Sequence, residues 1–357
     1  MKLLFTTLSN INANGGDTIQ QAEELKMYAK ENDCYFFSKY KFWSSVIIEQ
    51  IPLNVKLIFP TKENNIDNYF LCNDNYVKQI TLLDKELNFD YIFVRGSELL
   101  AKFCEENKEL FKKKVICYLT DLNHVSADKE YQIFKNAKLI KCQSQRYIDI
   151  IAKKYGIDKS KFFVQPPIID YVKTYKKEKK YDIIYTGKVQ KHWGVREYLE
   201  YLERNPDVNG AIVYPVIKNI LSDYDKIRVR ELLQSLKNVT EFVNQTKTKS
   251  NSLLALAKCS YCIRDEEIDN DNSHEISTKL LESLALGVPC IVRKNKLHLD
   301  LLGNDYDFFV DDYDDLDDVV NRVTNQTKDY DFEKIVKNFY NDEIYKNVKN
   351  VLNNNLD

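Results

Sequence analysis

One short stretch of the sequence, residues 272–290, places four polar side chains on one side of an expected helix. It reads NSHEISTKLLESLALGVPC. With about 100° of rotation per residue, Thr278, Lys279 and Glu282 fall within about 60° of Glu275. The other side of this helix is apolar and would face a core. The polar stripe begins at the helix N-terminus, where a particular chemistry becomes available.

That chemistry is the binding of a phosphate group. Ser277 or Thr278 is a natural N-cap, and Lys279 puts a cation in the first turn, where an acidic residue is normally preferred. Free backbone N–H groups, a hydroxyl and an ammonium together can hold a phosphate. Glu282, one turn further on, is placed to accept hydrogen bonds from ribose hydroxyls. If this helix stood alone, a solvated polar face would be the preferred interpretation.

The elements that must position these residues follow from the hydrophobic pattern. Short apolar runs alternate with helical patterns in both halves of the chain, which predicts parallel sheets covered by helices on both faces. Strands are expected within residues 2–8, 34–38, 55–60, 90–96, 115–121, 138–144, 181–188, 210–215, 239–243, 259–265, 289–294 and 306–312. Helices are expected at about 18–30, 98–111, 127–136, 145–155, 195–204, 214–236, 248–257, 277–286, 313–323 and 332–352.

A break between the two halves predicts two doubly wound α/β domains. Adjacent prolines and then a Lys-rich run separate the last apolar run of the first half from the first strand of the second. The expected division is an N-terminal domain at 1–168, a linker at 169–180 and a C-terminal domain at 181–330. A helix within 331–357 could pack back on the N-terminal domain. Sheets of this kind bind ligands at the carboxyl ends of their strands.

The composition indicates an ordinary globular protein. The 357 residues are 44% hydrophobic and carry a net charge of −2, which gives no general reason to expect nucleic acid as a partner. No apolar run approaches the roughly 18 residues of a membrane span. Eight Cys without a framework spacing suit reduced thiols in a cytoplasm. Cys259 and Cys262 form one C-x-x-C without a second pair, so neither metal binding nor redox chemistry is expected of them.

The run from Ile263 to Val292, IRDEEIDNDNSHEISTKLLESLALGVPCIV, resembles the nucleotide-sugar site of GT-B glycosyltransferases, especially the retaining family-4 type. In that family a strand ending in Arg, here Arg264, is followed by a loop and a (S/P)-T-K-x-x-E-x-L-A-x-G-x-P helix. The resemblance implies an α/β GT-B fold, in which two Rossmann-like, doubly wound domains face a central cleft. The C-terminal domain would bind the nucleotide sugar, and the N-terminal domain would lie on the acceptor side.

Two further segments are similar to the family's phosphate-binding segments. After the strand IIYTG comes Gly187-Lys188, similar to the family's G-R-L-x-x-x-K-G segment, whose two cations clamp the donor diphosphate. Lys188 replaces the usual Arg, and Lys191 stands two places before the usual Lys; Lys binds phosphate as a point charge, without the bidentate fork of Arg. In the first half, the loop ending in Gly15-Gly16 would let the backbone approach a ligand without obstruction by a Cβ atom.

The sequence departs from the family pattern at two places. Family members often have His-Asp where this chain has Thr120-Asp121; His124 could substitute for the missing His, or Asp121 could bind an acceptor hydroxyl. The first of the family's paired glutamates would fall at His274, which is followed here by Glu275. Either the carboxylate is shifted by one residue, or His274 takes its place against the sugar hydroxyls.

The resemblance implies a retaining, metal-independent hexosyltransferase. Its donor would be a UDP- or GDP-sugar bound as substrate, with no cofactor, and its acceptor a hydroxyl of a glycan, a lipid-linked or a protein-linked molecule. Asp-Tyr-Asp occurs four times, but in an Asp-rich chain no metal site is expected. The basic runs at 112–114 and 177–180 are expected to be solvated, with peripheral contact with the inner face of a membrane as the alternative. A nucleotide-sugar 2-epimerase of the same fold and a non-catalytic partner subunit remain as alternatives.

The implied site residues fall into four groups. The donor diphosphate would be bound by Gly16, Lys188, Lys191, Arg264, Ser277, Thr278 and Lys279. The ribose would be bound by Glu282, and the donor sugar by His274 and Glu275. The catalytic residues would be Asp121, His124, Glu275 and Lys279.

Overall fold

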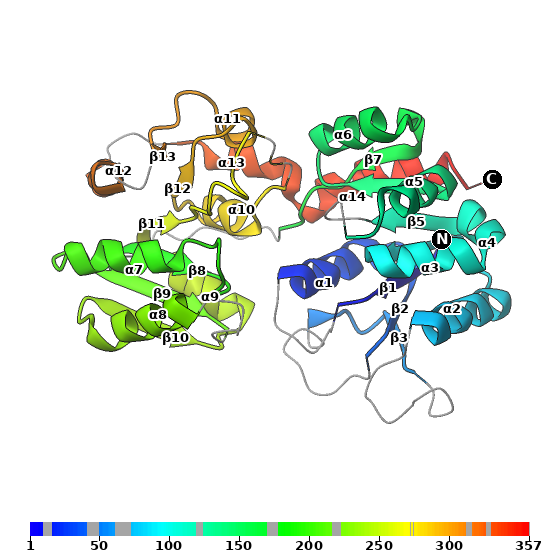
Figure 1. Ribbon diagram of the computed structural model, residues 1–357, viewed down its shortest axis with the longest axis horizontal. Coiled ribbons are helices and arrows are strands. Elements are labelled where there is room, and N and C mark those ends of the chain that lie inside the picture. Colours follow the sequence, from blue (N-terminus) through cyan, green and yellow to red (C-terminus); the bar gives the residue numbers. More distant parts are fainter. Residues whose placement is uncertain are drawn as a thin grey trace. The chain divides into compact units, whose positions relative to one another are not determined.

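The chain divides into two compact units, which Figure 1 shows in sequence colours. The computed structural model describes residues 1–9, 16–40, 50–60, 73–118, 124–169, 178–215, 223–271, 273, 275–311, 316–325 and 330–356. Unit 1 comprises Met1–Ile168 and Asn341–Asp357, and unit 2 comprises Ile169–Tyr340. The C-terminal segment thus belongs to the same unit as the N-terminus.

Unit 1 is built on a seven-stranded parallel sheet. Its order is β3-β2-β1-β4-β5-β6-β7. The strands are β1 (Lys2–Thr7), β2 (Asp33–Ser38), β3 (Lys56–Ile58), β4 (Tyr91–Arg95), β5 (Val115–Tyr118), β6 (Leu139–Cys142) and β7 (Phe162–Val164). All four residues of β5, and all four of β6, are buried. This uninterrupted burial is expected when helices cover both faces of a parallel sheet.

Two groups of helices cover the two faces of this sheet. On one face lie α1 (Gly16–Tyr28) and α14 (Asn341–Asn353). On the other lie α2 (Asn73–Leu87), α3 (Ser97–Glu106), α4 (Lys108–Lys114), α5 (Ala127–Asn136) and α6 (Gln145–Tyr155). The bounds of α6 have a local cause. The Ser144 hydroxyl caps its first turn by accepting from the Tyr147 N–H, and Gly156 ends it in the left-handed conformation.

Unit 2 contains a six-stranded parallel sheet in the order β10-β9-β8-β11-β12-β13. Its strands are β8 (Tyr181–Thr186), β9 (Gly210–Tyr214), β10 (Val239–Val243), β11 (Ala257–Tyr261), β12 (Cys290–Arg293) and β13 (Phe309–Val310). The chain adds strands outward from β8 in one direction and outward from β11 in the other. The carboxyl ends of β8 and β11 therefore form the topological switch point of this sheet, where ligands bind in open α/β sheets.

The helices of unit 2 surround this sheet. They are α7 (Val195–Arg204), α8 (Asp223–Ser235), α9 (Lys247–Leu254), α10 (Thr278–Ala285), α11 (Lys296–Leu302), α12 (Leu316–Thr324) and α13 (Phe332–Val336). The main core of the unit contains apolar residues of α7, α8, α10, α12 and α13, and a smaller cluster joins α9 to the sheet. The apolar stripe of α10 is fully buried in that main core, as its sequence pattern predicts.

The secondary structure follows the sequence prediction where the pattern is strongly periodic. The helices expected at 127–136, 145–155 and 195–204 have those bounds. Three elements were not predicted, namely α2, α11 and β7. The helix expected at 98–111 is two helices, because Asn107 ends α3 and its side chain caps α4.

The helix expected at 332–352 is also divided, in this case between the two units. Within unit 2, α13 ends at Val336, and a short 3-10 turn leads to Tyr340, which pairs with Ile169 in a β-bridge. The second helix, α14, then packs on the sheet of unit 1. Among the residues that the structure describes, no helix has both the length and the apolar character to cross a membrane.

Candidate functional site

The described site residues of unit 2 lie on the connections that follow β8 and β11 and in α10. These strands are hydrogen-bonded neighbours, and Tyr261, the last residue of β11, is in register with Tyr185. The loop after β8 begins with Gly187, and the segment after β11 leads through Arg264 to α10. Because the strands are parallel, both loops leave the same edge of the sheet. This edge is the switch point described above.

Lys279 crosses from α10 to the loop after β8. Its side chain is half-buried and lies against Gly187, where an added Cβ atom would be 3.0 Å from the lysine Cδ. Gly187 also has a φ of +138°, which side chains rarely tolerate. The lysine Nζ lies 4.3 Å from the centroid of the Tyr185 ring. The β8–α7 loop and the first turn of α10 are therefore in direct contact through this side chain.

The Lys279 ammonium is buried and has no hydrogen-bond partner among the described residues. Burial lowers the pKa of Lys279 to about 8, against a smaller opposing effect of the nearby Cys262 thiol. Ser277 is the N-cap of α10, but its side chain makes no capping hydrogen bond. An unpaired cation and uncapped amides at a helix start both favour an anion at this position.

A second set of contacts fixes the β8–α7 loop against the end of β11. The Asp265 N–H donates to the His192 carbonyl at 2.9 Å, and the His192 Nδ1 lies 3.1 Å from the Asp265 carboxylate. Gly194, with a φ of +64°, approaches so closely that an added Cβ atom would be 2.7 Å from the Ile263 carbonyl oxygen. The β8–α7 loop is thus held at both of its ends. Gly187 contacts Lys279 at its start, and His192 and Gly194 contact the segment after β11 at its end.

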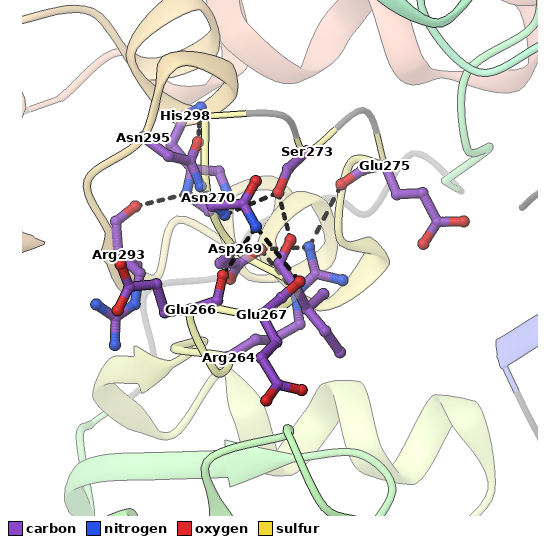
Figure 2. Close-up of polar contacts among 11 residues, drawn as sticks. Arg264, Glu266, Glu267, Asp269, Asn270, Ser273, Glu275, Arg293, Asn295 and His298 are labelled. Carbon is purple, nitrogen blue, oxygen red and sulfur yellow. Dashed lines mark hydrogen bonds and ion pairs between the residues drawn. The ribbon is translucent and has the colours of Figure 1, made fainter. Parts of the chain in front are cut away.

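Arg264 has an internal partner that the sequence did not predict. Its Nε and Nη2 atoms donate to Oδ1 of Asp269 at 3.0 and 2.5 Å, and Nη2 also lies 3.4 Å from the Glu275 carbonyl oxygen. Only 5% of Arg264 and 1% of Asp269 is exposed. Figure 2 shows this cluster, with the Glu275 carboxylate pointing away from it. Asp269 lies in an acid-rich loop, so its sequence context gave no sign that it is buried.

The other predicted residues of unit 2 have different environments. Glu282 forms an ion pair with Lys247 of α9 at 3.4 Å. Ser277 and Thr278, both half-buried, begin α10 beside Lys279. The Lys188 carbonyl accepts from the Tyr185 hydroxyl at 2.5 Å, and its side chain is half-buried. Lys191, in the β8–α7 loop, is exposed and forms no ion pair with a described residue.

The predicted residues of unit 1 are less constrained. Gly16 begins α1, is exposed, and has no atom within 4 Å of an added Cβ position, so its own geometry does not require glycine. His124 is exposed shortly before α5. Asp121 and His274 lie outside the described residues. Their assigned roles, like those of the other site residues, remain predictions.

The cysteines of the C-x-x-C pair are buried free thiols in unit 2. Within the described part of the chain, no group of three His, Cys, Asp or Glu side chains is arranged to hold a metal ion. Cys262 follows the last residue of β11, and a hydrogen bond from Cys290 lowers the pKa of its thiol. Tyr185 lies in the strand expected at 181–188 and was not predicted as a site residue; its ring lies beneath the Lys279 ammonium.

No protein-family model and no curated protein sequence matches the chain. Solved structures match it over nearly its whole length. A glycosyltransferase from Rickettsia africae has a TM-score of 0.72 at 13% identity and covers 99% of this chain and 98% of its own. TarM from S. aureus, solved with UDP, fondaparinux and α-GlcNAc-glycerol, has a TM-score of 0.71 at 11% identity, covering 99% and 100%.

The chain has the GT-B fold. The α/β GT-B architecture predicted from the motifs is therefore confirmed. The same fold is shared by the UDP-GlcNAc 2-epimerase from Methanocaldococcus jannaschii, with a TM-score of 0.61 at 14% identity over 99% of this chain and all of that one. At these identities the similarity is one of fold, so the reaction must be argued from the site.

Proposed function

We propose that this GT-B protein is a glycosyltransferase that moves a sugar from a UDP- or GDP-sugar to an acceptor hydroxyl with retention of anomeric configuration. The observation that carries the proposal is the Lys279 ammonium. It is buried without a hydrogen-bond partner among the described residues, at the N-terminus of α10 and at the switch point of the sheet. Burying an unpaired charge is unfavourable, and a bound diphosphate would supply the missing partner.

In the proposed reaction, the first turn of α10 and Lys279 stabilise the negative charge that develops on the leaving diphosphate. Lys188 and Lys191, from the loop after β8, would add positive charge, so the reaction would need no metal ion. The acceptor proton passes to a phosphate oxygen on the same face of the sugar as the acceptor attacks. No nucleophilic side chain is then required.

The remaining roles follow the position of each residue. Glu282, whose carboxylate is held by Lys247, would accept hydrogen bonds from the ribose. Glu275, or His274 beside it, would contact the sugar hydroxyls. Asp121 and His124 of unit 1 would contact the acceptor, a glycan, a lipid-linked or a protein-linked molecule. A membrane-bound acceptor would bring the protein to the membrane surface.

The test is a thermal-shift and calorimetry series with UDP, GDP and their sugars, on wild type and on two lysine variants. Lys279→Met should weaken diphosphate binding about 10- to 100-fold, since a charge-assisted hydrogen bond contributes about 1.5–3 kcal/mol. Lys237→Met is the matched control, because Lys237 is exposed in the same unit, and it should bind as wild type does. Equal stabilisation of wild type and Lys279→Met by every diphosphate would refute the site.

The fold shared with the epimerase supports a second candidate, a nucleotide-sugar 2-epimerase. The two reactions differ in their need for a second substrate. Incubation of the protein with nucleotide sugar alone, followed by separation of the sugars, distinguishes them. Epimer formation without an acceptor would favour the epimerase, whereas product that appears only with an acceptor would support the transferase.

A further inference from the structure

The connection between β11 and α10 has a hydrogen-bonded structure of its own. Asp265 begins it, and its carbonyl accepts from the Asp269 N–H at 2.8 Å. The Ser273 hydroxyl accepts from the Asn270 N–H at 2.9 Å and donates to the Ile268 carbonyl. These contacts fold the described residues of 265–277 into a compact loop, in which Figure 2 labels Asp269, Asn270 and Ser273. The loop ends at Glu275 and the N-cap of α10, so its conformation sets the position of both.

A single guanidinium holds this loop at two points. Arg264 reaches the middle of the loop through the Asp269 carboxylate and its end through the Glu275 carbonyl. Both partners of the ion pair are buried, so solvent screens their attraction little, and removal of either would leave a buried charge unpaired. The fork of the Arg side chain makes this two-point grip possible.

The far side of the loop is held by α11. The Lys296 N–H donates to the Asp271 carboxylate at 2.9 Å. Asn295 caps the same helix by accepting from the His298 N–H at 2.8 Å, and the His298 Nδ1 lies 2.7 Å from the Arg293 carbonyl oxygen. Asn295 and His298 are almost fully buried. The loop is therefore held by the capped start of α11 on one side and by the Arg264–Asp269 pair on the other.

We propose that Arg264 and Asp269 are positioning residues, whose buried ion pair fixes the 265–277 loop and thereby places Glu275 and the first turn of α10 for the donor. This inference rests on the proposed function for its role in donor binding. It gives Arg264 a different task from direct neutralisation of the diphosphate. With Asp269 at hydrogen-bond distance, the pair has no net charge, so a nearby diphosphate experiences a dipole rather than a free cation.

The two roles of Arg264 predict opposite effects of Asp269→Asn. If Arg264 binds the diphosphate directly, removing the competing carboxylate frees the guanidinium, and affinity for UDP rises. If the pair positions the loop, the loop loosens, and affinity for UDP falls. Glu266→Gln is the matched control, because it removes one negative charge from an exposed position in the same loop.

Amide hydrogen exchange over residues 265–277, with calorimetry of UDP binding, tests the proposal. In Asp269→Asn we expect exchange of the loop to accelerate about tenfold or more and UDP affinity to fall about three- to tenfold, while Glu266→Gln matches wild type. Unchanged loop exchange, or a higher affinity for UDP, in Asp269→Asn would overturn the proposal.

If Asp269→Asn disrupts the whole of unit 2, amide exchange will also accelerate in β8. Arg264→Lys is then the variant that tests the proposal. Lys keeps the charge balance but cannot grip two points, so loop exchange should accelerate about threefold or more without a change in β8. Loop exchange as slow as in wild type would count against positioning. If wild type binds neither UDP nor GDP, the proposed function fails, whereas the exchange measurements still decide the role of the pair.

Discussion

The chemistry proposed for this protein depends on one residue, Lys279, more than on any other. Its ammonium is buried over the Tyr185 ring, without a hydrogen-bond partner among the described residues. A lysine can be held in this way because its single charge sits on a flexible stem and its pKa shifts readily on burial. The pKa of about 8 keeps the side chain mostly charged at neutral pH, but close to losing its proton.

The lowered pKa of Lys279 predicts how diphosphate binding depends on pH. The charged form, which attracts the diphosphate, predominates below pH 8 and is lost as the pH rises through that value. Affinity for UDP should therefore fall by up to about tenfold between pH 7 and pH 9, with proton uptake on binding near pH 8. Calorimetry across this pH range, in buffers of different ionisation enthalpy, measures both the affinity for UDP and the number of protons taken up on binding. A flat profile in wild type, or an equal decline in Lys279→Met, would contradict the assignment.

At the scale of elements, the site depends on two connections that leave neighbouring parallel strands. The β8–α7 loop is held to the end of β11 by the His192–Asp265 contacts and by the close approach of Gly194 to the Ile263 carbonyl. The β11–α10 loop is held by Arg264. Each loop is irregular, so its conformation depends on these contacts rather than on backbone periodicity.

Gly194 provides a test of how closely the two connections pack. Gly194→Ala should lower the free energy of unfolding by about 1–2 kcal/mol for the left-handed backbone, with a further loss from the clash with Ile263. Gly156→Ala is the matched control, since Gly156 has the same φ of +64° but open space at its Cβ position. Denaturant unfolding should show the larger loss for Gly194→Ala. Equal losses would mean that the neighbouring carbonyl moves aside easily.

At the scale of the whole molecule, the chain returns at its end to the unit in which it began. The last helix, α14, buries Ile344, Val348 and Leu352 against α1 and the sheet of unit 1. The Tyr91 hydroxyl, on β4, donates to the Leu352 carbonyl at 2.7 Å. Unit 1 therefore includes a second segment, Asn341–Asp357, which begins more than 170 positions after Ile168, the last residue of its first segment.

This arrangement predicts that the C-terminal helix stabilises unit 1. Leu352→Ala should reduce the free energy of unfolding by about 2–5 kcal/mol, because it opens a cavity at a fully buried position. Leu356→Ala, at a position that is 45% exposed, should change it by less than about 0.5 kcal/mol. Hydrogen exchange would place the effect of Leu352→Ala in the strands of unit 1. A uniform effect on both units, or none, would contradict this role.

The elements that the sequence predicted best are those whose local pattern agrees with their tertiary environment. The helix at 145–155 has a capping Ser before it, a Gly after it and a clear apolar stripe, and the structure gives it those bounds. By contrast, α11 is only seven residues long and begins at an Asn cap, so its pattern was too short to detect. The expected helix at 98–111 failed at Asn107, which competes for backbone hydrogen bonds and starts a second helix.

The sequence by itself predicted two doubly wound α/β domains and the cationic start of α10, because hydrophobic periodicity and the spacing of Ser277, Lys279 and Glu282 are local properties of the chain. The GT-B fold came from the resemblance of the 263–292 segment to a known family. Only the tertiary structure decided the partners of these residues. Gly187 and Lys279 are 92 positions apart and meet because β8 and β11 pair in parallel. Arg264 is paired with Asp269 because the loop folds back on itself, and both side chains of this pair are buried although they stand in an acid-rich, polar stretch of sequence.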